Sequence, residues 1–161
     1  MPIVALAALR DAVAPGKRLL GLDLGSKTIG MAVSDGGWTV ASPIGTIARR
    51  KFTLDAIELK AAIDERNVGA LVLGLPVNMD GTEGPRCQST RQFATNLMQK
   101  FDMPIAFQDE RLSTAAVERL LIDEVDMTRK RRGEVVDKMA AAWILQGALD
   151  SLARLARERQ A

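Results

Sequence analysis

The sequence predicts a single α/β domain built on a mixed five-stranded sheet with helices on both faces. Two observations support this fold class. Three strand-like segments follow one another near the start of the chain, and strand-like and helix-like segments then alternate to its end. The first pattern is typical of antiparallel hairpins, and the second of parallel strand–helix units. A chain of 161 residues is long enough to bury a core of its own.

The five strands are expected at residues 18–24, 28–34, 38–47, 69–74 and 104–108. A tight Gly25-Ser26-Lys27 turn joins the first two, and Asp35-Gly36-Gly37 is a hairpin signal before the third. Residues 69–74 (Gly-Ala-Leu-Val-Leu-Gly) form a continuous apolar run. Such a run is typical of a central parallel strand, which is buried on both faces.

Helical spacing of apolar residues predicts four helices, at residues 53–66, 84–101, 113–125 and 133–157. The first has Thr53 as its expected N-cap and carries apolar residues at Leu54, Ile57, Ala61 and Ala62. The second is expected to turn Phe93, Leu97 and Met98 inward. A further short helix at residues 3–9 is expected to pack on the domain. The chain is therefore divided into an N-terminal extension (1–17) and the main domain (18–161).

Composition excludes several kinds of chemistry. The chain has no histidine and no tyrosine, so histidine acid–base pairs, Ser-His-Asp triads and Cys/His zinc sites cannot form. Cys87 is the only cysteine, which fits a reducing cytosol, and we expect a cytoplasmic protein. No run approaches the ~18 apolar residues of a membrane span, so no membrane partner is expected. The net charge of +2 is too small to indicate a partner by itself.

Three carboxylates occupy positions that the predicted fold would bring together. Asp137 shares a helical stripe with apolar residues, where a charge loses hydration and needs a partner or a metal. Asp23 lies at the end of the first strand, and Asp109-Glu110 lies at the end of the last. In α/β sheets, the carboxyl ends of parallel strands line the ligand crevice. The stripe of Asp137 consists of Ala140, Ala141, Ile144 and Ala148. Two plainer alternatives are a helix-start carboxylate stabilised by the helix dipole and three unrelated surface acids.

Converging carboxylates indicate a hard metal ion, because they would repel one another unless a cation neutralised them. Mg²⁺ or Mn²⁺ suits a site made only of oxygen ligands. Two such ions about 3.5–4 Å apart activate a water and stabilise the leaving oxygen in phosphodiester hydrolysis. Strand alternation alone does not choose between Asp109 and Glu110 as the second acid.

Other residues are candidates for contact with nucleic acid, and each has a plainer interpretation. The candidates are Lys27, Asn78, Asp80, Arg111 and the run Arg129-Lys130-Arg131-Arg132. Asn78 and Asp80 belong to a turn in which Gly81 is expected to have a positive φ. Arg111 can equally hold a neighbouring carboxylate by charge-assisted bonds. The basic run is expected to be a mobile loop between two helices, and charge runs are often only solvated surface.

Four blocks, in order, resemble the signature blocks of the YqgF/RuvX family. They are residues 22–30 (LDLGSKTIG), 74–81 (GLPVNMDG), 109–114 (DERLST) and 136–141 (VDKMAA). The resemblance covers residues 18–150, nearly the whole chain. Members of this family are bacterial nucleases with an RNase H-like fold, described both as Holliday junction resolvases and as pre-16S rRNA nucleases.

The resemblance implies an RNase H-like fold and an acidic trio at Asp23, Glu110 and Asp137, both catalytic and metal-binding. It thereby favours Glu110 over Asp109. The implied activity is metal-dependent hydrolysis of phosphodiester bonds in 5′-end maturation of pre-16S rRNA, with structured RNA and ribosomal precursor particles as partners. The alternatives are a Holliday junction resolvase acting on branched DNA, and a nucleic-acid-binding module that does not cut. A kinase-like ATPase is disfavoured because that architecture pairs two such domains. Oligomeric state is not predicted.

Overall fold

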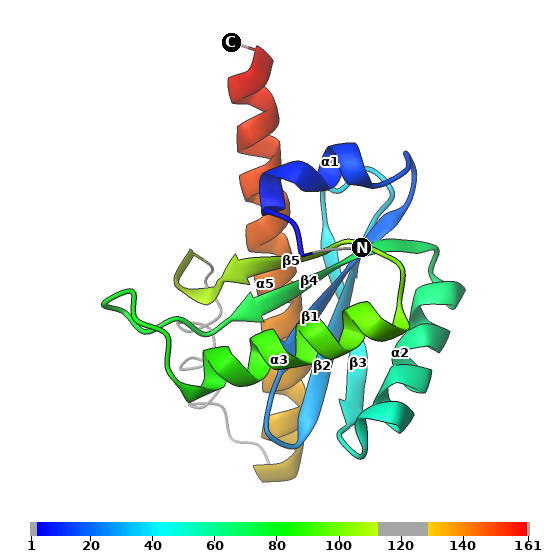
Figure 1. Ribbon diagram of the computed structural model, residues 1–161, viewed down its shortest axis with the longest axis vertical. Helices are drawn as coiled ribbons and strands as arrows, with labels where there is room; N and C mark the ends of the chain where they lie inside the picture. The colour runs from blue at the N-terminus through cyan, green and yellow to red at the C-terminus, as the bar shows by residue number, and fades with distance from the viewer. Residues whose placement is uncertain (1–2, 113–128, 161) are drawn as a thin grey trace.

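The computed structural model describes residues 3–112 and 129–160, with the backbone alone at 112, 129–138 and 160. Its strands are β1 (Arg18–Leu24), β2 (Thr28–Ser34), β3 (Ala41–Ala48), β4 (Val68–Leu75) and β5 (Ile105–Asp109). They form one sheet in the order β3-β2-β1-β4-β5. β2 is antiparallel to β1 and β3, whereas β4 is parallel to β1 and β5. The mixed five-stranded sheet expected from the sequence is confirmed (Figure 1).

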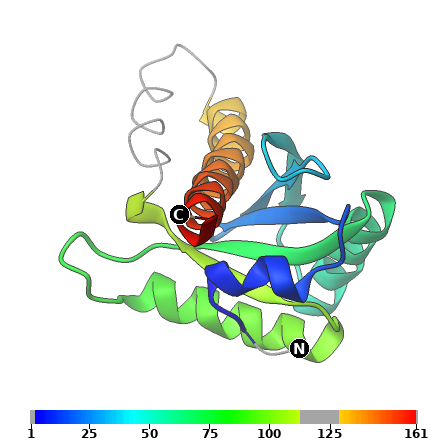
Figure 2. The same cartoon turned by 90° about the horizontal axis from the view of Figure 1, so that it is seen from above.

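Helices cover both faces of this sheet (Figure 2). α2 (Phe52–Glu65) and α3 (Pro85–Lys100) lie on one face, and α5 (Arg129–Gln160) lies on the other. The core under α2 and α3 contains alternate residues of β1 and β4, among them Leu22 and Leu73. A second core under α5 contains Leu19 and Val72. None of the helices in the described ranges is both long and apolar enough to cross a membrane.

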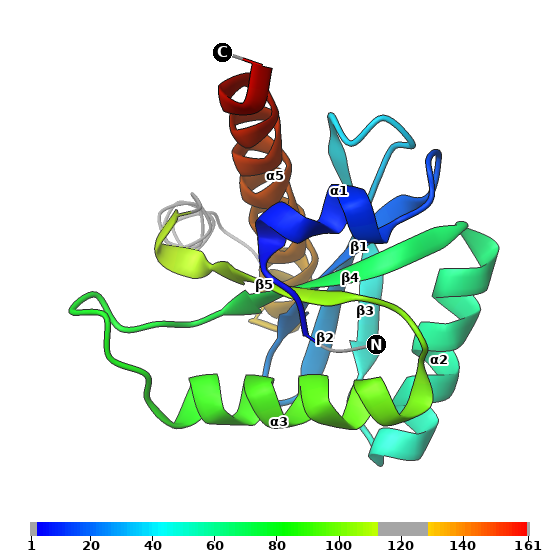
Figure 3. The ribbon, with the colours of Figure 1, turned by 45° about the horizontal axis from the view of Figure 1, so that its top comes forward.

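The N-terminal segment packs on the domain, as the sequence predicts, but the expected helix at residues 3–9 is displaced along the chain. It consists of one 3₁₀ turn (η1, Leu6–Ala8) and one helical turn (α1, Leu9–Ala12). Figure 3 shows this segment lying across the sheet near β5. Ile3 bridges Ile105 of β5, whose carbonyl accepts a hydrogen bond from the Val4 N–H at 2.9 Å. Leu9 is fully buried in the core under α5.

β3 begins later than residue 38 because the chain before it is held by Asp35. Its carboxylate accepts hydrogen bonds from the Thr39 N–H (2.7 Å), the Thr39 hydroxyl (2.6 Å) and the Val40 N–H (3.0 Å). These bonds, that of the Thr39 hydroxyl first, lower the pKa of Asp35 to about 2. The left-handed residue in this connection is Trp38, at φ 59°, rather than a glycine.

The expected N-cap of α2 is wrong. α2 begins at Phe52 with Lys51 at its N-cap, so Thr53 lies inside the helix. Of the apolar residues in the expected pattern, Ala62 is buried, whereas Leu54 and Ile57 are 39% and 65% exposed. The apolar stripe that α2 turns toward the sheet consists of Ala56, Leu59, Ala62 and Ile63.

The basic run is not a loop between helices, because α5 begins at Arg129 and includes it. Arg and Lys favour helix formation, and the single Gly133 costs only about 1 kcal/mol relative to alanine. That cost does not end a helix of 32 residues. The helix expected at residues 113–125 lies outside the described residues.

α5 lies directly against the strands because two of their residues have no side chain. A Cβ built on Gly21 of β1 would lie 2.8 Å from Cβ of Leu145 and 3.2 Å from the carbonyl oxygen of Ala141. A Cβ on Gly74 of β4 would lie 2.5 Å from Cδ1 of Ile144. Contacts this short require the neighbour to move, so the two glycines determine how close α5 approaches.

Gly21→Ala should therefore destabilise the protein by about 1–3 kcal/mol, the usual cost of overpacking a core. The free energy of unfolding can be measured by urea denaturation. Gly37→Ala is the matched control, since its new Cβ would have Oδ2 of Asp35 at 3.5 Å as its nearest neighbour. Equal stability of the two variants would contradict the close-packing argument.

Candidate functional site

The carboxyl ends of β1, β4 and β5 place three residues in a row on the face that α5 covers. These residues are Asp23, Gly74 and Gln108. Leu22 pairs with Leu73, and Gly74 pairs with Gln108, so one step further along β1, Asp23 lies level with Gly74. Since Leu22 lies in the core under α2 and α3, strand alternation turns Asp23 to the opposite face, under α5. Asp23 is only 3% exposed, and a buried charge needs compensation from its surroundings.

Glu110 brings a second carboxylate to this row. It is the first residue of the 3₁₀ turn η2 (Glu110–Leu112), which follows β5 directly. A Cβ built on Gly74 would lie 3.2 Å from Oε1 of Glu110, so this carboxylate extends back over the glycine. Neighbouring strands lie about 4.8 Å apart, and Asp23 occupies the next strand. The structure thus places Asp23 and Glu110 as neighbours on one face of the sheet.

Asp137 lies in α5, the helix that covers this row. Ala141, one helical turn later, is at the level of Gly21 on β1. Moving two residues along β1 from Gly21 to Asp23 covers about 7 Å, and moving four residues back along α5 to Asp137 covers about 6 Å. Later α5 residues such as Leu149 share a core with Leu19, so α5 runs opposite to β1. The backbone of Asp137 therefore lies on the side of Ala141 that is toward the end of β1 where Asp23 is located.

The stripe expected to accompany Asp137 is buried, since Ala140, Ala141, Ile144 and Ala148 are all 0% exposed. The side chain of Asp137 itself lies outside the described residues. Among the side chains that the structure describes, no three acidic or cysteine residues form a group that could hold a metal ion. Asp23 and Glu110 would therefore need an acid from outside that set to complete a three-carboxylate site.

Gln108 is a member of the row that sequence reasoning missed. It is 2% exposed, and its side-chain Nε2 is fully buried with no hydrogen-bond partner among the described residues. A buried donor left unpaired costs about 1–3 kcal/mol, so such groups often mark a place where water or a ligand completes the structure. The signal in the sequence was one polar residue directly after the apolar segment Ile105-Ala106-Phe107, within the same strand.

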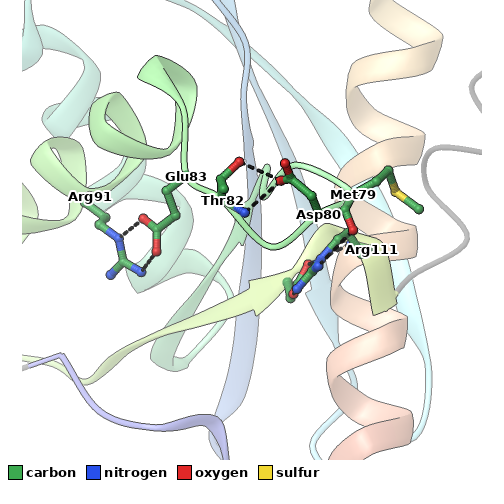
Figure 4. A network of polar contacts seen from close by, with 7 residues as sticks. Met79, Asp80, Thr82, Glu83, Arg91 and Arg111 are labelled. Atoms are coloured by element: carbon green, nitrogen blue, oxygen red, sulfur yellow. Dashed lines mark hydrogen bonds and ion pairs between the residues drawn. The ribbon is translucent and has the colours of Figure 1, made fainter.

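The loop after β4 is held by its own polar groups. Asp80 accepts hydrogen bonds from the hydroxyl (2.6 Å) and N–H (3.0 Å) of Thr82, and these bonds lower its pKa. The Asn78 amide donates to the same hydroxyl at 3.0 Å, and Gly81 has the expected positive φ of 89°. Figure 4 shows Met79 and Asp80 at this turn, with Arg111 beside them. The predicted turn is confirmed, and within the described residues Asn78 and Asp80 bond inside the loop.

Arg111 holds a carboxylate, but that carboxylate belongs to Asp109 rather than to Glu110. Its Nη2 donates to Oδ2 of Asp109 at 2.7 Å, and its Nη1 donates to the carbonyl of Met79 at 3.4 Å. The hydrogen bonds from Arg111 lower the pKa of Asp109. Arg111 therefore ties the end of β5 to the loop after β4 (Figure 4).

The remaining candidates lie around the same edge of the sheet. Lys27 is exposed in the turn between β1 and β2, and its carbonyl accepts a hydrogen bond from the Arg49 N–H at 2.8 Å. The run 129–132 forms the first residues of α5, and its side chains lie outside the described residues.

Two solved structures with a similar fold are Holliday junction resolvases. The chain is similar to the yeast mitochondrial Holliday junction resolvase Ydc2, with a TM-score of 0.54 and 15% identity over 96% of this chain and 87% of that one. It is also similar to RuvC of Thermus thermophilus in complex with a Holliday junction, with a TM-score of 0.51 and 12% identity over 84% of this chain and 94% of that one. The fold is thus the RNase H-like fold of these resolvases.

The family follows from closer matches. The profile of the RuvX family, described as Holliday junction resolvase, matches residues 17–151. A protein of Rhodospirillum rubrum is 62% identical over 96% of both chains. One of Paramagnetospirillum magneticum is 64% identical over 94% of this chain and 97% of its own. Both bear the name "Putative pre-16S rRNA nuclease". The chain belongs to the RuvX family.

Arg111→Gln should raise the pKa of Asp109 toward its ordinary value. A carboxyl with a depressed pKa contributes stability at neutral pH that is lost as the pH falls from about 4 through the folded-state pKa. The variant should therefore lose less stability on acidification than the wild type. Carboxyl-carbon NMR titration measures the pKa, and melting at several pH values measures the stability.

Arg91→Gln is the matched control, because Arg91 donates to Glu83 at 2.6 and 2.8 Å and lowers the pKa of that carboxyl instead. This variant should raise the pKa of Glu83 and leave that of Asp109 unchanged. An unchanged Asp109 pKa in Arg111→Gln would contradict the assigned pairing.

Proposed function

We propose that this protein is a metal-dependent nuclease that hydrolyses phosphodiester bonds, with Asp23, Glu110 and Asp137 as its catalytic acids. The supporting observation is the row at the end of the sheet, where the buried Asp23 and the Glu110 carboxylate adjoin the glycine between them. Three acids from β1, η2 and α5 lie far apart in the sequence. A site that only bound phosphate would favour basic side chains over acidic ones at this position. The acidic row therefore favours a nuclease over a nucleic-acid-binding module that does not cut.

The residues present fit a divalent cation. The donor set consists of carboxylate oxygens, which Mg²⁺ and Mn²⁺ prefer. The Nε2 of Gln108, which has no hydrogen-bond partner among the described residues, lies in the same row. It can donate to a carboxylate or to a water of a hydrated ion, as groups around metal ligands commonly do. When bound, such ions activate the attacking water and stabilise the leaving oxygen. Asp23, Glu110 and Asp137 would hold them.

The dipole interpretation of Asp137 is disfavoured by the start of α5. The helix begins at Arg129, eight residues before Asp137, whereas the dipole effect is confined to the first turn. A carboxylate on a buried stripe this far into a helix needs another explanation, and a shared metal supplies one.

RNA is the proposed substrate, specifically the precursor of 16S rRNA at its 5′ end. The names of relatives about 60% identical over nearly the whole chain support it. The likeness to the DNA junction resolvases, at 12–15% identity, supports the fold alone. Lys27 and the run 129–132 are proposed to contact phosphates beside the acids, with ribosomal precursor particles as the setting. Asn78, Asp80 and Arg111 are proposed to support the loop that borders the substrate.

This assignment can be tested by incubating the same purified protein, side by side, with a precursor rRNA fragment and with a four-way DNA junction. The RNA should be cut and the junction left intact. Cleavage of the junction alone would contradict the RNA assignment and favour the resolvase alternative.

Activity should require Mg²⁺ or Mn²⁺, and Asp23→Asn should lose nearly all of it while keeping the fold. The reason is that the variant removes one of the oxygen ligands on which the metal depends. Asp64→Asn is the control, since Asp64 is exposed and pairs with Lys60 on the outer surface of α2. Full cleavage in excess chelator, or by Asp23→Asn, would refute the mechanism.

Asp137→Asn should stabilise the metal-free protein, by about 0.5–2 kcal/mol, the scale of relieving strain at a functional site. It removes one negative charge from a repelling cluster and keeps the side-chain volume. Mg²⁺ should stabilise the wild type by mass action and stabilise the variant less. Melting temperatures with and without Mg²⁺ measure both effects.

Asp150→Asn on the same helix is the control, because the Asp150 carboxylate is exposed and accepts a hydrogen bond from Gln146 at 3.0 Å. It should leave the response to Mg²⁺ unchanged. Lower metal-free stability of Asp137→Asn with an unchanged metal effect would make Asp137 a structural residue.

A further inference from the structure

A cationic pocket lies at the same end of β1 as Asp23, but on the other face of the sheet. It has a volume of about 450 Å³ and lies between the β1–β2 turn and the first turns of α3. The turn lies beside α3 in Figure 3. The pocket is lined by Leu24, Gly25, Ser26, Arg49, Pro85, Arg86, Ser89 and Thr90. Leu24 is the next residue after Asp23, so one strand end borders both the acidic row and this pocket.

Two guanidinium groups are held at the pocket by backbone carbonyls of the turn. Nη1 of Arg49 donates to the carbonyl of Gly25 at 2.7 Å, and Nη2 of Arg86 donates to that of Leu24 at 3.5 Å. Arg49 also lies over the ring of Phe93, with 5.6 Å from Cζ to the ring centre. These contacts orient both side chains and leave most of their five N–H donors available.

Neither guanidinium is neutralised by a carboxylate of the described residues. Arg50, the neighbour of Arg49, pairs with Glu58 at 3.1 Å, and Arg91, further along α3, pairs with Glu83 at 2.6 Å. The hydroxyl groups of Ser26 and Ser89 add neutral donors to the lining. Two fixed positive charges with further donors form a site for an anion of phosphate size.

From this geometry we infer that Arg49 and Arg86 bind one backbone phosphate of the nucleic-acid strand whose cleavage is proposed above. The inference rests on the proposed function, because it assigns a second contact to the same substrate. The strand would pass over the Gly25-Ser26-Lys27 turn, from the acidic row on one face to the arginine pocket on the other. The pocket thus supplies attraction for a polyanion that the carboxylates repel.

The test is the salt dependence of binding, measured by fluorescence anisotropy with a single-stranded RNA oligonucleotide in excess chelator. Each neutralised phosphate contributes about 0.7–0.9 to the slope of log K against log salt concentration. The double variant Arg49→Gln with Arg86→Gln should make this negative slope shallower by about this amount. The change corresponds to roughly 5- to 8-fold weaker binding at 0.1 M salt. The double variant Arg49→Lys with Arg86→Lys keeps the charges and should keep the slope.

Arg154→Gln with Arg159→Gln is the control, because it removes the same net charge near the far end of α5, where these arginines pair with Glu158 and Asp11. Its slope should equal that of the wild type. Arg86→Glu provides a second test if the double variant unfolds, since it leaves the packing of Arg49 on Phe93 in place. It should weaken binding more than Arg154→Glu does.

An unchanged slope in the glutamine variant would refute the inference, and so would an equal loss in the control. If inorganic phosphate binds the wild type but not the variant while RNA binding stays the same, the pocket takes free phosphate and the backbone assignment is wrong. Because binding is measured without cleavage, the two proposals fail separately. A wild type that binds with the arginine-dependent slope but never cuts would refute only the nuclease function.

Discussion

The site depends on how closely α5 approaches the strands of the sheet. Gly21 and Gly74 leave no side chain between β1, β4 and the helix, and atoms of α5 occupy the space that their Cβ atoms would take. Asp23 lies two residues beyond the first glycine, and the Glu110 carboxylate lies over the second. The contact that packs α5 onto the sheet is therefore the contact that buries one carboxylate and confines the other. A larger residue at Gly74 would have to displace either the core or the acid.

Much of the fold could be predicted from local pattern, and the misses have a common cause. β1 and β2 were predicted with the bounds they have, because turn residues limit two buried runs. The inner face of α2 does not follow from its sequence, because apolar residues lie on more than one side of the helix and only packing against the sheet determines which side is buried. Leu54 and Ile57 belong to the stripe left outside. The early start of α5 does not follow from the local pattern, because a glycine such as Gly133 commonly marks a helix boundary, although a long helix tolerates one.

The candidate site was predictable to a similar degree. Alternation along β1 places Asp23 on the face opposite Leu22, which lies in the core under α2 and α3. It could not separate Asp109 from Glu110, because regular alternation ends at Asp109, where β5 passes into a 3₁₀ turn. The two adjacent acids then differ in surroundings, one held by Arg111 and the other over Gly74. Gln108 was overlooked because the lack of a partner for its Nε2 among the described residues is a property of packing, which no local pattern contains.

The charges at this edge of the sheet explain why binding and cutting need different residues. Carboxylates that gather a metal also repel the phosphates of the substrate, so affinity has to come from cations outside the acidic row. The arginines that pair with Glu83 and Asp109 have their charge offset locally. Arg49 and Arg86 are instead held by uncharged carbonyls, which orient a guanidinium without cancelling its field. Because those carbonyls belong to the strand end and turn that follow Asp23, a shift of this turn would move the proposed phosphate contact and the proposed catalytic acid together.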